Sequence, residues 1–143
     1  MIAKLVRLQS RKRVKMRSEP AARAPHTNFE LGWWAAVSLS AGFSEELIFR
    51  GYLIWVAQPL LGYWGAAALS VVLFAIAHGY QGAGSAMAVG IVGALFTVVV
   101  LVFGSLWPAI VIHCLLDLQQ GVSAWLVLRE PLAPKVLAKD SQT

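Results

Sequence analysis

Six ionisable side chains stand in a stretch of the sequence that is otherwise apolar. Between residues 31 and 128 they are the complete set of Asp, Glu, Lys, Arg and His: Glu45, Glu46, Arg50, His78, His113 and Asp117. A charge at membrane depth costs roughly 2.5–3.5 kcal/mol even on insertion scales, so its default interpretation is functional. The six residues therefore predict one site that is assembled from distant parts of the chain.

The spacing of the first group separates two kinds of carboxylate. Glu46 and Arg50 are four residues apart and face each other on a helix, which predicts a structural ion pair. An unpaired arginine in low dielectric would be very costly, and the pair removes that cost. Glu45 is turned about 100° away from Glu46 and must point at other partners.

The candidate partners of Glu45 are His78, His113 and Asp117, of which the last two again lie four residues apart. A carboxylate in a partly dry cavity can take a proton from water and later give it to a leaving amine. An imidazole can donate to a developing oxyanion. These four residues therefore predict hydrolysis of a peptide bond by an activated water, without a covalent intermediate.

Other chemistries remain open at this point. Ser40 and Ser44 are weaker candidates for a nucleophile, and Cys114, next to His113, is expected to be a small packed residue. Two histidines and two carboxylates can ligate zinc, which gives a metal-dependent membrane protease as an alternative. No His-Glu-x-x-His pairing is present, so we expect no metal and no cofactor.

The composition indicates a membrane protein. The 143 residues are 58% hydrophobic and only 13% charged, whereas a soluble globular domain carries about 25% charged residues. We expect an all-α, polytopic helix bundle with about four membrane-spanning helices. The predicted spans are residues 31–60, 63–80, 86–103 and 106–128.

The first predicted span is too long for one upright crossing. At 1.5 Å per residue it would run about 45 Å, against a hydrocarbon core of about 30 Å. It is therefore either tilted or broken near residues 38–42. Thr27 or Asn28 can cap its start, with Glu30 in the first turn. Residues 58–62 form the turn that ends it.

The chain divides into a basic arm (residues 1–28), a membrane-embedded core (29–128) and a polar tail (129–143). Residues 1–25 hold eight basic residues and one acidic residue. Such an arm favours the cytoplasmic side and attracts anionic lipid. An even number of spans then places both ends in the cytoplasm. We expect no nucleic-acid partner, because the arm has no interleaved aromatic residues and no attached reading domain.

Three motifs carry a family resemblance: Glu45-Glu46-x-x-x-Arg50, Phe74-x-x-x-His78 and His113-x-x-x-Asp117. In this order, each on a predicted membrane helix, they resemble the CPBP family of CAAX proteases, bacteriocin-processing enzymes and abortive-infection proteins. The resemblance covers about residues 30–120.

The resemblance implies an intramembrane glutamic endopeptidase that acts on a membrane-associated protein or peptide. Glu45 would activate the water, helped by His78, while His113 and Asp117 complete the site and stabilise the oxyanion. Glu46 and Arg50 would hold the architecture. Family members usually carry further helices before the first motif, and eukaryotic members have Asn where this chain has Asp117. The rival interpretation is a non-catalytic immunity or scaffold protein of the same fold.

Overall fold

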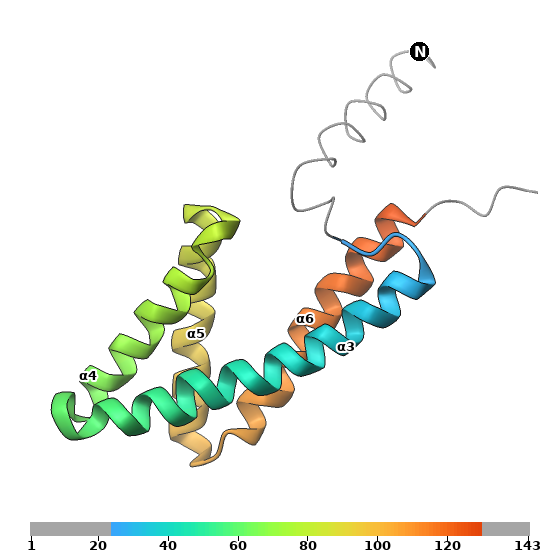
Figure 1. The fold of residues 1–143 in the computed structure, drawn as a ribbon. Coiled ribbons are helices and arrows are strands. Elements are labelled where there is room, and N and C mark those ends of the chain that lie inside the picture. The colour runs from blue at the N-terminus through green and yellow to red at the C-terminus, as the bar shows by residue number, and fades with distance from the viewer. Residues whose placement is uncertain (1–23, 130–143) are drawn as a thin grey trace, which may run out of the picture. The chain divides into compact units, whose positions relative to one another are not determined.

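The computed structural model describes residues 24–129, and every regular element within them is a helix (Figure 1). The all-α prediction is therefore confirmed. The predicted arm up to residue 23 and the tail from residue 130 lie outside the described residues, so their cytoplasmic placement stays a prediction. The elements, in chain order, are α3 (Asn28–Glu46), the π-helix η1 (Leu47–Leu53), α4 (Ile54–Ala77), the 3₁₀-helix η2 (Gly79–Gln81), α5 (Ala83–Phe103) and α6 (Trp107–Leu128).

The described residues form two compact units, and each is considered by itself. One unit runs from Ala35 to Gln119 and contains all six ionisable residues of the predicted site. The other combines residues 24–34 with residues 120–129.

The start of α3 follows directly from the local sequence. The Glu30 amide donates to the Thr27 hydroxyl at 3.2 Å. In return the Glu30 carboxylate accepts from the backbone amides of His26 at 2.6 Å and Thr27 at 3.2 Å. This reciprocal pattern is a capping box, which satisfies amides that have no partner within the helix. Of the two predicted caps, Thr27 is the one that the structure uses.

Of the two alternatives for the first span, the break near residues 38–42 is wrong, because α3 is helical through these positions. Small residues there serve close packing instead. A Cβ on Gly42 would lie 2.5 Å from Cys114 Sγ and 2.9 Å from the Cys114 backbone nitrogen. Only a glycine lets the two helices approach this closely, as is common between membrane helices.

The predicted turn at residues 58–62 is realised at one residue. Gly62 has φ 67° and ψ 169°, a conformation that only glycine adopts readily, and it interrupts α4. Figure 1 shows the chain reversing here, after which α4 runs back beside α5. The first two predicted spans are therefore joined by a single non-helical residue.

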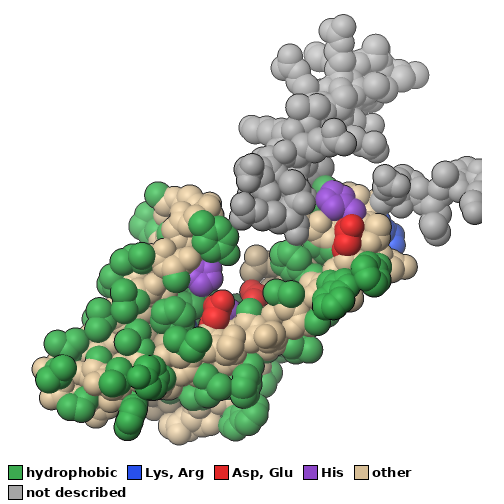
Figure 2. All heavy atoms as spheres, viewed as in Figure 1, with side chains coloured by type: hydrophobic (Ala, Val, Ile, Leu, Met, Phe, Trp, Pro, Cys, Tyr) green, Lys and Arg blue, Asp and Glu red, His purple; other side chains and the backbone are tan. Residues whose placement is uncertain are grey.

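Three helical stretches are long and apolar enough to cross a membrane: Asn28–Ala77, Ala83–Phe103 and Trp107–Leu128. The first contains two of the four predicted spans, with the reversal at Gly62 between them. Large apolar side chains cover the outside of these helices, and Leu60, Trp55 and Val102 are at least 71% exposed. Figure 2 shows hydrophobic side chains over most of the viewed face of the described helices. Such a surface suits lipid rather than water.

Replacing Gly62 by alanine should destabilise the fold by roughly 1–3 kcal/mol, because the side chain would be forced into a conformation that only glycine tolerates. The measurement is the free energy of unfolding in detergent. Gly32→Ala is the matched control, since Gly32 lies within α3 and a Cβ there meets nothing within 4 Å. Equal stability of the two variants would contradict the prediction.

Candidate active site

The Arg50 guanidinium lies at the base of the site, fully buried. Its Nη1 donates to Glu46 Oε1 at 3.1 Å, and both side chains have no exposed surface. The guanidinium also stands over the Phe74 ring at 4.3 Å and the Phe96 ring at 5.7 Å. Desolvated contacts of this kind can contribute about 2 kcal/mol. The charge is thus compensated by one carboxylate and two ring faces.

A glycine on α5 makes room for this arginine. A Cβ on Gly93 would lie 2.6 Å from Arg50 Nη2 and 2.8 Å from Phe74 Cδ1. Nothing larger than glycine fits there without moving the guanidinium or the ring. The absence of a side chain at Gly93 therefore allows the Arg50 guanidinium to pack against Phe74.

The backbone that presents Arg50 is a π-helix rather than an α-helix. It begins directly after Glu46 and continues to Leu53. Ser70, which is fully buried on α4, donates its hydroxyl to the Phe49 carbonyl within this segment at 2.6 Å. Short π-helical stretches occur frequently at functional sites. Here the altered winding lies next to the two adjacent carboxylates.

The His113 ring lies between the two adjacent carboxylates. Its Nδ1 is 2.8 Å from Glu46 Oε1, which is a hydrogen bond. A carboxylate that also accepts from Arg50 can only accept here, so Nδ1 carries the proton. Its Nε2 lies 3.7 Å from Glu45 Oε2 and 3.7 Å from Asp117 Oδ2. Glu46 therefore does more than pair with Arg50, because it also orients His113.

The His78 ring is oriented by its own helix. The Nδ1 atom lies 2.9 Å from the Phe74 carbonyl oxygen, which can only accept, so this nitrogen is the donor. His78 ends α4, and its backbone amide donates to Ala75 rather than to Phe74. The opposite ring nitrogen, Nε2, faces Glu45 Oε2 at 3.9 Å.

Glu45 is the side chain that these groups share. Its Oε2 is within 4 Å of Nε2 atoms from both histidines, at separations too long for direct hydrogen bonds. Its side chain is 28% exposed, and that of Asp117 is 30% exposed, whereas Glu46 is fully buried. Figure 2 shows acidic and histidine side chains reaching the viewed surface together. The structure thus brings all six predicted residues together and leaves Glu45 accessible.

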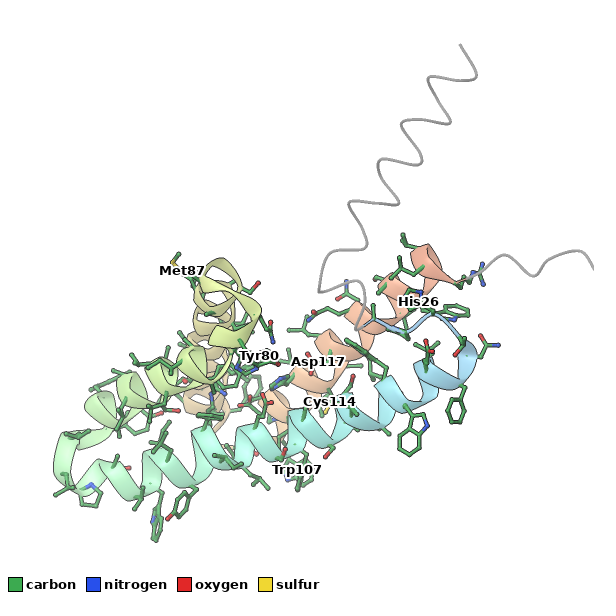
Figure 3. The ribbon with its side chains drawn as sticks, turned by 45° about the horizontal axis from the view of Figure 1, so that its top comes forward. His26, Tyr80, Met87, Trp107, Cys114 and Asp117 are labelled. Carbon is green, nitrogen blue, oxygen red and sulfur yellow. The ribbon has the colours of Figure 1, made fainter. Side chains whose placement is uncertain are left out.

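Two of the alternative nucleophile candidates, Ser44 and Cys114, make hydrogen bonds outside the site. The Ser44 hydroxyl donates to the Ser40 carbonyl of its own helix at 2.7 Å. Cys114 is buried, with its sulfur 3.7 Å from the Leu39 carbonyl oxygen. Figure 3 shows Cys114 and Asp117 on neighbouring turns of α6. Among residues 24–129, no group of three or more His, Cys, Asp or Glu has a geometry that could hold a metal ion.

Sequence reasoning missed three residues of the site: Ser70, Gly93 and Phe96. None is ionisable, and each stands among apolar residues of the same helix. The only available signal was that Ser70 and Gly93 are small residues at predicted helix interiors, and such residues are common wherever membrane helices pack closely.

The helices and the site define a class: a protein of apolar helices with a glutamate–histidine centre between them. Comparison with known protein families identifies the family to which the chain belongs. Residues 27–119 match the Rce1-like type II CAAX prenyl endopeptidases, and the chain belongs to that family. No curated protein and no solved structure matches the chain. The family and the three apolar stretches together indicate a membrane protein with peptidase activity.

Gly93→Ala should destabilise the protein by roughly 1–3 kcal/mol, because the added methyl group overlaps with Arg50 and Phe74. The free energy of unfolding in detergent is the measurement. Gly84→Ala is the control on the same helix, since a Cβ there meets nothing within 4 Å. If both substitutions have the same small effect, the close packing around Arg50 is not required.

Proposed function

We propose that the protein is an intramembrane glutamic endopeptidase, which hydrolyses a peptide bond of a membrane-associated protein or peptide with a water activated by Glu45. The observation that carries the proposal is the position of Glu45 Oε2, 3.9 Å from His78 Nε2 and 3.7 Å from His113 Nε2. One water can bridge polar atoms at such separations. The family description supports the reaction class.

In the proposed reaction Glu45 takes one proton from water and later gives it to the leaving nitrogen. The carboxylate accepts a proton from water while the water oxygen forms a bond to the scissile carbonyl carbon. The carbonyl electron pair moves onto its oxygen and gives a tetrahedral intermediate. When this collapses, the C–N bond breaks and Glu45 gives its proton to the leaving nitrogen. The products are a carboxylic acid and an amine.

His78 would assist as the neutral imidazole. With its Nδ1 proton held by the Phe74 carbonyl, its Nε2 carries a lone pair that faces Glu45. This nitrogen can accept a hydrogen bond from the water and hold the water oxygen toward the substrate. The acceptor holds the water in one orientation, and a reactant held in the right geometry reacts faster than a mobile one.

His113 and Asp117 would stabilise the oxyanion. To donate from Nε2, His113 must be protonated on both nitrogens, since Nδ1 already donates to Glu46. Its surroundings support that form, because Glu46, Glu45 and Asp117 all lie within 4 Å of the ring nitrogens. A proton at Nε2 would then face the position where negative charge develops.

Access for the substrate fits the exposure of the site. The side chains of Glu45 and Asp117 are partly exposed, whereas the ion pair of Glu46 and Arg50 beneath them is fully buried. The apolar outer surface suits a location in lipid, so we propose membrane lipid as the surrounding partner. A cavity open to water on one side reconciles a charged site with membrane depth.

The decisive experiment compares the peptides in membranes that carry wild type or Glu45→Gln at matched expression. We expect a cleaved membrane or lipid-anchored peptide with wild type only, and the same unfolding midpoint for both proteins. Ser44→Ala is the matched control, because the Ser44 hydroxyl donates to carbonyls in the preceding turn of its own helix. This variant should retain the wild-type product and so separate a glutamate mechanism from a serine mechanism.

A zinc chelator provides the second comparison. A product that persists with chelator supports the glutamic mechanism, and a product that disappears supports the zinc-dependent alternative. If Glu45→Gln leaves the biological effect of the protein intact while Arg50→Ala abolishes folding, the protein is a non-catalytic immunity or scaffold factor and the proposal is wrong.

A further inference from the structure

The helix α5 contains no ionisable residue and none of the three motifs, yet one of its side chains reaches the site. Phe96 is 3% exposed. Its ring stacks on the His113 imidazole, with centroids 5.1 Å apart and planes inclined by 29°. The same ring lies 5.7 Å from the Arg50 guanidinium carbon. Phe96 thus contacts a histidine that has carboxylates within 4 Å of both ring nitrogens.

The contact matters because a hydrogen bond alone does not fix a ring. The bond from Nδ1 to Glu46 holds one atom of the His113 imidazole. The side chain can still change χ1 and χ2 together within the tolerance of that hydrogen bond, and such a change displaces Nε2. Its two separations of 3.7 Å, to Glu45 and to Asp117, therefore depend on the plane of the ring.

A second contact is needed to set this plane, and the geometry selects Phe96 for it. Phe74 meets His113 in a T-shaped arrangement at 6.2 Å and 87°, so its centroid is farther from the imidazole than that of Phe96. A stacked ring face opposes rotation of the imidazole out of its plane, and offset stacking is a preferred arrangement of aromatic pairs. Phe96 provides the one stacked ring face that His113 has among the described residues.

We propose that Phe96 is a positioning residue of this site, which sets the plane of the His113 imidazole so that Nε2 faces Glu45 and Asp117. The catalytic consequence rests on the proposed peptidase function, whereas the effect on the His113 ring does not. Loss of the stacked face lets Nε2 leave its position, and misplacement by about 1 Å can cost up to roughly a hundredfold in rate.

The first test observes the His113 ring directly. Protein labelled with ¹⁵N-histidine is compared in detergent as wild type and Phe96→Leu, with the His113 signals assigned by their loss in His113→Asn. In wild type we expect one set of His113 ring signals with a protonated Nδ1. In Phe96→Leu we expect broadened or doubled signals. Unchanged His113 signals in the variant would overturn the proposal.

The second test measures cleavage of a synthetic peptide that spans the bond found by the peptide comparison. We expect Phe96→Leu to lower kcat by roughly tenfold to a hundredfold, with KM within about twofold of wild type. Leu95→Ala is the matched control on the same helix, since Leu95 is 59% exposed, and it should keep the wild-type kcat. A wild-type kcat in Phe96→Leu would contradict the proposal.

Should Phe96→Leu fail to fold, Phe96→Met replaces it, because methionine fills apolar space without a planar face. Wild-type His113 signals in that variant would overturn the proposal, and broadened signals would support it. If Glu45→Gln proves as active as wild type, the peptidase proposal fails, and the ¹⁵N spectra alone still decide the role of Phe96.

Discussion

The burial of the Arg50 guanidinium is the constraint on which the rest of the site depends. A guanidinium cannot lose its proton in a protein, so an apolar interior must supply compensation. One hydrogen bond to Glu46 and two aromatic faces supply it, while Nε and Nη2 have no hydrogen-bond partner among the described residues. These contacts come from separate helices. Packing the arginine therefore requires the same helix arrangement that brings the glutamates and histidines together.

The ionisable half of the site was predictable because charge is so costly in apolar surroundings. Glu45, His78 and His113 are far apart in the chain. The sequence still indicated that they belong to one site, because the Glu46–Arg50 ion pair leaves their ionisable side chains without an explanation. The apolar half was not predictable. Phe96 is the same residue type as Phe103 on the same helix, which is 65% exposed. Composition cannot tell a phenylalanine that stacks on a histidine from one that faces lipid.

The backbone shows the same division. A turn at Gly62 could be expected from its glycine and the preceding proline, but the π-helix from Leu47 had no signal in the sequence. The small residues near position 40 left a break in the helix open as one alternative, and that alternative is wrong. Ser38 there is 3% exposed, and Gly42 packs on Cys114, so these residues allow close packing. Small residues predict a bend and a tight contact equally well, and only the partner helix decides between them.

The last turn of α4 links the length of a helix to the tautomer of a ring. In a regular α-helix the Phe74 carbonyl would accept from the His78 backbone amide. Here that amide bonds to Ala75 instead, and the imidazole takes the carbonyl. In a regularly wound helix the amide and the imidazole would share this carbonyl, because a carbonyl oxygen has two lone pairs. At the end of α4 the His78 amide leaves the carbonyl to the ring, which keeps its proton on Nδ1 and presents the lone pair of Nε2 to Glu45. The end of the helix thus helps to fix which ring nitrogen of His78 can accept a proton.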